Sequence, residues 1–236
     1  MLGIGLVVEL LALYILSRRV TQGLFTFFLL LFRSRSVALS LVLVLEFPGT
    51  AVHELSHLFT AGILGVRAGK LTLTPEIESE HVHSGSVSIE HTDPFRRYAI
   101  ALAPVVWGTL ILCAIAYLLP SYWPDWGNLG NMGYWGTPQP YIFLLLPYCM
   151  FAVSNTMFSS PEDLKGFIPY IITIGIFVGL LYYLGVRFVL TGVVLETATR
   201  VLVTLVKSLG VVVGVNIGIL IILQLMTRMM MKIRRI

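Results

Sequence analysis

Residues 47–65 read FPGTAVHELSHLFTAGILG and place His53, Glu54 and His57 inside an apolar segment. The apolar run around them covers 36–66, more than the roughly 20 residues that a helix needs to cross a bilayer. Ionisable side chains within a membrane helix cost free energy and usually serve a function. The stretch therefore predicts a membrane helix that carries a chemical site.

Composition extends this prediction to the whole chain. Hydrophobic residues make up 57% of the 236 residues and charged residues 12%, whereas soluble domains carry about 25% charged residues. We therefore expect an all-α fold, a polytopic transmembrane helical bundle in the lipid bilayer. The 16 Lys and Arg residues are scattered beside apolar segments, so a nucleic-acid partner is not expected.

Apolar runs of sufficient length predict about six or seven spans. Two short runs, 3–16 and 20–32, form either a hairpin or one span with one interfacial segment. The longer runs are 36–66, 95–119, 141–159, 167–190 and 209–227. The chain then divides into N-terminal membrane segments over 1–35, a core over 36–166 and C-terminal transmembrane helices over 167–236.

A polar insert over 67–94 follows the helix that carries the histidines. Leu71 and Leu73 alternate with threonines in it, and Val87 and Ile89 alternate with serines. Alternation with a period of two predicts short β-strands. Because an open sheet edge cannot lie in lipid, we expect a small sheet at or above the cytoplasmic surface.

The distribution of basic residues predicts the orientation in the membrane. The loop at 120–139 has no Lys or Arg and is rich in Trp and Tyr, which suits the outer face. Arg67, Lys70 and the C-terminal MKIRRI then lie inside, in agreement with the positive-inside rule, whereas Arg187 counts against it. The compact chain suits a multi-pass protein of a prokaryotic inner membrane, with its site toward the cytoplasm.

The spacing of His53 and His57 favours a metal site. Residues four apart share one face of a helix, so both imidazoles can bind one metal. Glu54 lies about 100° round the helix from His53, close enough to reach a metal-bound water without being a ligand. Two His ligands and a Glu base form the zinc hydrolase arrangement, in which the Glu takes a proton from the activated water. The alternative is a pair of core histidines satisfied by hydrogen bonds.

A catalytic zinc needs a third protein ligand and an open position for water. The segment 154–166, SNTMFSSPEDLKG, follows the predicted span 141–159 and offers two acids, Glu162 and Asp163. On position alone both are possible third ligands.

Three further polar residues lie in apolar runs. Glu46 either orients His53, since a metal-bound His usually donates its other N–H to such a group, or lies at a membrane boundary. Asn216 and Gln224 of the last span are expected to hydrogen-bond between helices.

HELSH in an apolar segment, followed by Asn155 and then by Asp163 eight positions later, resembles the site-2 protease family of intramembrane zinc metalloproteases. The resemblance covers about residues 37–166 and includes the strand-rich insert. Two positions depart from the family's second motif: Leu164 stands where the family has Gly, and Glu162 where it has Leu.

The resemblance implies one Zn²⁺ per chain, bound by His53, His57 and Asp163. Glu54 is then the general base. Asn155 then helps to hold either the substrate backbone or the developing oxyanion. The implied activity is hydrolysis of peptide bonds in a transmembrane or membrane-adjacent protein substrate.

Other functions remain open. A prenyl-protein-type membrane protease also uses this motif in a membrane, with a Glu as third ligand. A non-catalytic membrane protein would keep the metal for structure or transport ions past His53. The insert either pairs with an unwound substrate by strand addition or caps the site.

Overall fold

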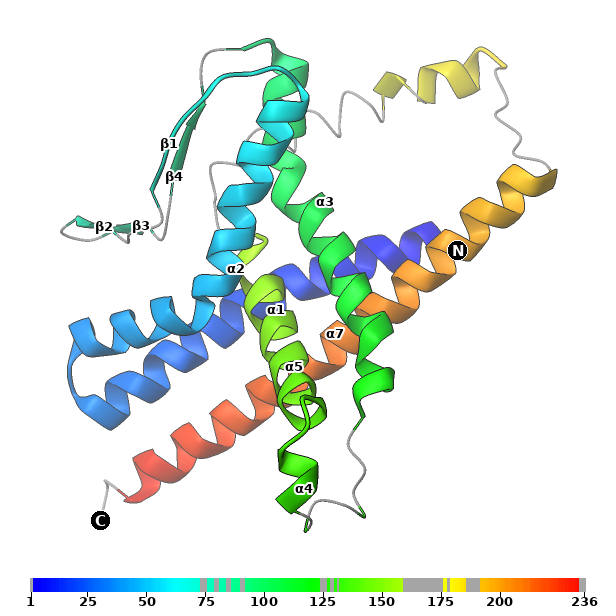
Figure 1. The fold of residues 1–236 in the computed structure, drawn as a ribbon. Coiled ribbons are helices and arrows are strands. Elements are labelled where there is room, and N and C mark those ends of the chain that lie inside the picture. Colours follow the sequence, from blue (N-terminus) through cyan, green and yellow to red (C-terminus); the bar gives the residue numbers. More distant parts are fainter. Residues whose placement is uncertain are drawn as a thin grey trace.

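The computed structural model contains five helices of 18 residues or more among the residues it describes (Figure 1). The described residues are 2–72, 76–78, 81–83, 86–89, 92–123, 127, 130, 132–158, 176–177, 179–185 and 192–233. The five helices are α1 (Leu2–Phe32), α2 (Arg35–Ile63), α3 (Pro94–Leu118), α5 (Gln139–Thr156) and α7 (Gly192–Ile233). A short 3₁₀ helix, η1 (Leu119–Tyr122), continues α3, and α4 (Met132–Trp135) precedes α5.

Three of the described helices are long and apolar enough to cross a membrane: α2, α3 continued through η1, and α7. This finding indicates a membrane protein but does not support six or seven spans. The predicted span 141–159 corresponds to α5, which has 18 residues and is not among the three. The predicted span 167–190 falls largely outside the described residues.

The two N-terminal segments predicted from the sequence are one continuous helix, α1, so the hairpin expectation is wrong. The polar residues that suggested a break are accommodated within the helix. Ser17 Oγ donates to the Tyr14 carbonyl at 3.0 Å, and the Arg18 guanidinium lies 4.7 Å from the Tyr14 ring centroid. Arginine is also a good helix former. The chain turns only at Arg33, whose φ is 55°.

Side-chain caps mark the starts of α2 and α3. The Ser34 side chain accepts a hydrogen bond from the Val37 N–H at 3.4 Å. Asp93 accepts one from the Arg96 N–H at 3.1 Å, and Pro94 occupies the first helical position. Such residues satisfy N–H groups that have no partner within the helix.

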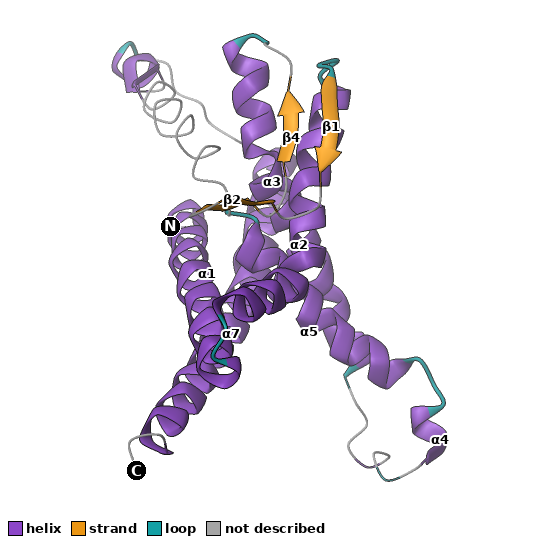
Figure 2. Ribbon diagram, turned by 90° about the vertical axis from the view of Figure 1, so that its left-hand side faces the viewer, coloured by secondary structure: helices purple, strands orange, loops and turns teal. Residues whose placement is uncertain are grey.

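Four short strands follow α2 in the sequence and precede α3. They are β1 (Ala68–Thr72), β2 (Glu76–Glu78), β3 (His81–His83) and β4 (Ser86–Ile89). Figure 2 shows β1 and β4 side by side. β1 pairs antiparallel with β4, and β2 pairs antiparallel with β3. The described strands therefore form two separate pairs, whereas the sequence predicted one small sheet.

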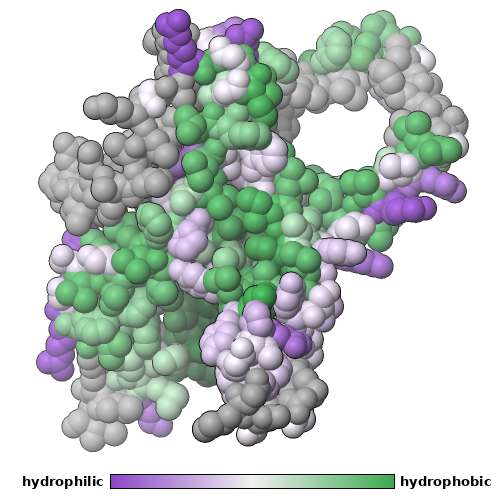
Figure 3. Space-filling model, viewed as in Figure 1, coloured by the Kyte–Doolittle hydropathy of each residue, from purple (hydrophilic) through white to green (hydrophobic). Residues whose placement is uncertain are grey.

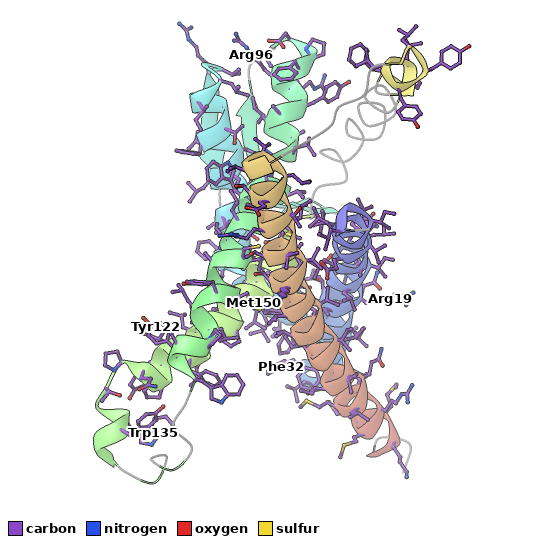
Figure 4. The ribbon with its side chains drawn as sticks, turned by 90° about the vertical axis from the view of Figure 1, so that its right-hand side faces the viewer. Arg19, Phe32, Arg96, Tyr122, Trp135 and Met150 are labelled. Carbon is purple, nitrogen blue, oxygen red and sulfur yellow. The ribbon has the colours of Figure 1, made fainter. Side chains whose placement is uncertain are left out.

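A buried apolar cluster holds α1, α3, α5 and α7 together. Its members are Leu13, Leu112, Ile115, Met150, Val153, Met157, Leu209 and Val212. Met150 of α5, labelled in Figure 4, is fully buried in this cluster. The cluster packs four helices around the end of α5, which is also the end that approaches α2.

α2 and α5 are in close contact at Gly49. A Cβ at this position would run into the carbonyl of Ala152 and the Thr156 hydroxyl. Only glycine permits such a backbone approach, as is common between membrane helices. The contact fixes the last turn of α5 against the middle of α2.

Candidate metal centre

Around the HELSH stretch, α2 buries its polar side chains and exposes large apolar ones. His53 is 4%, Glu54 6% and His57 6% exposed, whereas Leu55 is 49% and Phe59 56% exposed. Soluble proteins show the opposite arrangement, but lipid can cover an exposed apolar face. α2 therefore turns the HELSH polar groups toward its neighbouring helices.

The two imidazoles converge as the four-residue spacing predicts. His53 Nε2 and His57 Nε2 lie 3.2 Å apart, and the two rings are nearly perpendicular, at 79°. His57 Nδ1 is 2.8 Å from the Ile100 carbonyl oxygen of α3. Because a carbonyl only accepts, Nδ1 carries the hydrogen, and Nε2 of a neutral His57 presents its lone pair toward His53.

This arrangement fits two ligands of one zinc ion. Two imidazole nitrogens, each about 2.0–2.1 Å from a tetrahedral zinc, lie about 3.3 Å apart. The carbonyl bound to Nδ1 is the kind of partner that orients a metal-ligating histidine. The same separation also suits a direct His53–His57 hydrogen bond, which is the non-metal interpretation of the pair.

Both candidates for a third ligand, Glu162 and Asp163, are outside the described residues. Within them, no group of three or more His, Cys, Asp or Glu side chains is placed to hold a metal ion. None of His53, Glu54 and His57 is without an interaction partner. The choice between Glu162 and Asp163 therefore stays a prediction.

Glu46 has a partner on a different helix. Thr21 Oγ1 of α1 donates to Glu46 Oε1 at 2.5 Å. The partner that orients His57 is the Ile100 carbonyl, and the role of Glu46 toward His53 stays a prediction. Sequence reasoning missed Ile100, because a backbone carbonyl leaves no signal in the residue type.

Asn155 belongs to a buried amide network between α5 and α7. Its Nδ2 donates to the Phe151 carbonyl at 2.7 Å and to Asn216 Oδ1 at 3.0 Å. Asn216 Nδ2 donates to Ser154 Oγ at 2.9 Å and to the Val212 carbonyl at 3.0 Å. The predicted interhelical hydrogen bonding of Asn216 is thus confirmed.

The last turn of α5 meets the histidine face of α2. Gly49 precedes His53 by four residues and so shares its face. Ala152 and Thr156 pack against Gly49, and Asn155 lies in the same turn of α5 as Thr156. The contact therefore lies about one helical turn, roughly 5.4 Å, along α2 from His53.

An apolar groove of about 730 Å³ runs between α2 and α3 beside the HELSH stretch. Phe59 and Trp107 line it with their rings in edge-to-face contact, 5.0 Å between centroids. Ser56 also borders it, although its hydroxyl is bonded to the Val52 carbonyl at 2.6 Å. Hydrophobic residues cover much of the molecular face seen in Figure 3.

The chain matches no protein-family model, and no curated protein or solved structure matches it. The chemistry of the site itself therefore indicates its function. That chemistry consists of the converging His53–His57 pair, the Ile100 carbonyl that orients it and the buried Glu54 beside it.

Proposed function

We propose that the chain is a zinc metalloendopeptidase that hydrolyses peptide bonds of transmembrane or membrane-adjacent protein substrates. One observation carries the proposal. His53 Nε2 and His57 Nε2 converge to 3.2 Å on the buried face of a helix that is apolar enough to cross a membrane. A buried pair of this kind is costly to keep in a membrane helix unless it has a use.

The residues of the chain take separate roles. His53, His57 and Asp163 hold one zinc ion, and the Ile100 carbonyl fixes the His57 ring. Bound zinc supplies Lewis acidity, which polarises a peptide carbonyl and lowers the pKa of water. Glu54 accepts the proton of the attacking water and returns it to the leaving amine nitrogen.

Substrate reaches this site in extended form, because a helix hides its carbonyl groups. β1 begins five residues after the end of α2 and pairs with β4 alone among the described strands. An unwound substrate segment can add to such an edge through backbone hydrogen bonds. The site then faces the cytoplasm in a prokaryotic inner membrane, the side on which the positive-inside rule places Arg67.

Zinc content and proteolysis, measured together, test the proposal. The full chain is purified in detergent without chelators, and bound zinc is measured by elemental analysis. Cleavage of fluorescein-labelled casein is followed in parallel. We expect about one zinc per wild-type chain. Glu54→Gln should keep the zinc and lose cleavage by at least about 100-fold, since it removes the general base.

Single variants of the two acids identify the third ligand. Asp163→Ala should lose zinc, and the matched control Glu162→Ala should keep it. The reverse result would favour the prenyl-protein-type alternative, which takes a Glu ligand. A wild type without zinc, or a fully active Glu54→Gln, would refute the protease proposal. A zinc-loaded but inactive wild type would favour the non-catalytic metal-binding or transport alternative.

A further inference from the structure

The orientation of the Asn155 carboxamide is fixed by hydrogen bonds to groups that can only accept. Asn155 Nδ2 donates to the Phe151 carbonyl, and Asn216 Nδ2 donates to the Val212 carbonyl. Asn216 Oδ1 consequently faces Asn155 Nδ2 and accepts its second hydrogen, at 3.0 Å. Both donors of Asn155 are therefore occupied within the protein.

The oxygen of the same carboxamide has no such partner. Asn155 Oδ1 is buried and, among the described residues, accepts no hydrogen bond. Asn155 itself is 6% exposed. A buried amide oxygen without a donor is costly, and such groups in native proteins require an explanation. Asn155 Oδ1 is thus an unused hydrogen-bond acceptor, in the turn of α5 that packs beside the His53 face.

Asn216 lies deep in an apolar stretch of α7. The 20 residues between Lys207 and Arg228 carry no charge and cover about 30 Å of helix, the thickness of the hydrocarbon core. Asn216 is 1% exposed near the middle of this stretch. Polar groups at such depth face the interior and pair with one another, which suits a residue that acts on Asn155.

We propose that Asn216 is a positioning residue, which turns Asn155 so that its Oδ1 accepts a hydrogen bond from a backbone N–H of the peptide substrate. The proposal rests on the protease function and chooses between the two roles considered for Asn155. An oxyanion needs a hydrogen-bond donor, and both Asn155 donors are occupied. An extended peptide presents backbone N–H groups to either side and supplies the missing donor.

The test compares two zinc-binding probes on the zinc-loaded full chain in detergent. One is a peptidyl hydroxamate, which offers an extended backbone, and the other is acetohydroxamate, which offers none. Asn155→Ala and Asn216→Ala should each weaken the peptidyl probe about tenfold, the loss of one buried hydrogen bond. Zinc content and the affinity for acetohydroxamate should not change.

Two further measurements identify the hydrogen bond itself. Methylation of the backbone amides of the peptidyl probe, one at a time, should reveal one amide whose methylation weakens wild-type binding about tenfold. The same methylation should not change the affinity of the Asn155→Ala variant for the probe. The double variant Asn155→Ala/Asn216→Ala should bind no more weakly than Asn155→Ala alone, because the two residues act on one contact.

Controls separate positioning from packing. Gln224→Ala changes an exposed amide of the same helix and should leave both probe affinities unchanged. If Asn216→Ala fails to fold, Ser154→Ala removes one acceptor of the Asn216 amide and should weaken the peptidyl probe about threefold. An Asn216→Ala or Ser154→Ala protein that loses thermal stability but keeps wild-type affinity for the peptidyl probe would show a mere interhelical clamp and overturn the proposal.

The outcome for the wild type is informative on its own. A wild-type chain that binds no zinc and neither probe would refute the protease function, and the positioning role with it. A wild type that binds zinc and both probes, beside an Asn216→Ala variant with unchanged affinities, would refute only the positioning role. Equal weakening of both probes would place the defect at the metal and also overturn it.

Discussion

At the residue scale, Glu46 shows how a half-buried acid of one helix pairs with a hydroxyl group of another. Its carboxyl group accepts a hydrogen bond from Thr21 of α1 and thereby joins α1 to α2. His57 is instead oriented by the Ile100 carbonyl of α3. Two polar groups of α2 therefore have separate tasks: Glu46 joins α2 to α1, and His57 joins α2 to α3.

Replacement of Thr21 by Val should separate these tasks. Thr21→Val keeps the side-chain shape but leaves the Glu46 carboxyl group without its donor, which should lower the free energy of unfolding by about 1–3 kcal/mol. Zinc content should stay at the wild-type level. Thermal unfolding and elemental analysis of the same detergent preparation check both expectations. Loss of zinc without loss of stability would instead support the role of Glu46 in orienting His53.

Side-chain pattern predicts only part of the site. The convergence of His53 and His57 follows from helical spacing and was predictable. The Ile100 carbonyl was not, because any residue provides one. The interhelical bonding of Asn216 was predicted from its place in an apolar run, whereas its partners Asn155 and Ser154 depend on how α5 and α7 pack.

At the element scale, the crossing of α2 and α5 depends on the absence of a side chain at Gly49. The neighbouring carbonyl of Ala152 belongs to the helix backbone and cannot move aside as a flexible side chain can. The same crossing brings the turn of Asn155 to the histidine face. Stability and site geometry therefore share one contact.

Gly49→Ala should lower both the stability of the protein and its activity. The added methyl group forces the helices apart, and such overpacking costs about 1–3 kcal/mol or more. The variant should also lose most cleavage of casein, because the end of α5 moves away from His53. The matched control is Gly62→Ala, in the same helix, where an added Cβ meets nothing within 4 Å. A Gly49→Ala protein as stable as Gly62→Ala would contradict the close approach.

The boundaries of the elements were only partly predictable. Ser17, Arg18 and Arg19 suggested a break, but hydrogen bonding to Tyr14 and the helix propensity of Arg keep α1 continuous. Alternating apolar residues predicted strands in the insert. They could not specify which strands pair, because pairing depends on the turns between the strands as well as on periodicity.

At the scale of the whole molecule, α2 and α3, which the His57–Ile100 hydrogen bond joins, run in opposite directions (Figure 1). Arg96 and Tyr122, labelled in Figure 4, mark the two ends of α3 with η1. These 29 residues extend over about 43 Å, more than the roughly 30 Å of a hydrocarbon core. The strands and η1 should therefore lie on opposite sides of the membrane.

Cysteine labelling checks this arrangement. In a background with Cys113→Ala and Cys149→Ala, Arg67→Cys should react with a membrane-impermeant maleimide only in inverted vesicles. Ser121→Cys should react in intact spheroplasts, since the positive-inside rule predicts that η1 lies outside. Reaction of both positions from the same side would contradict a membrane-spanning α3. If Arg67→Cys reacted only in spheroplasts and Ser121→Cys only in inverted vesicles, α3 would still span the membrane, but in the opposite orientation.

The length of α7 has a mechanical consequence. Its 42 residues make a rod of about 63 Å, roughly twice the hydrocarbon thickness. Asn216 lies within this rod and is tied to α5 by hydrogen bonds of 2.9 and 3.0 Å, within the usual range of about 2.7–3.2 Å. An axial shift of α7 by one residue, about 1.5 Å, would move these atoms beyond that range. It would loosen Asn155 without touching the histidines.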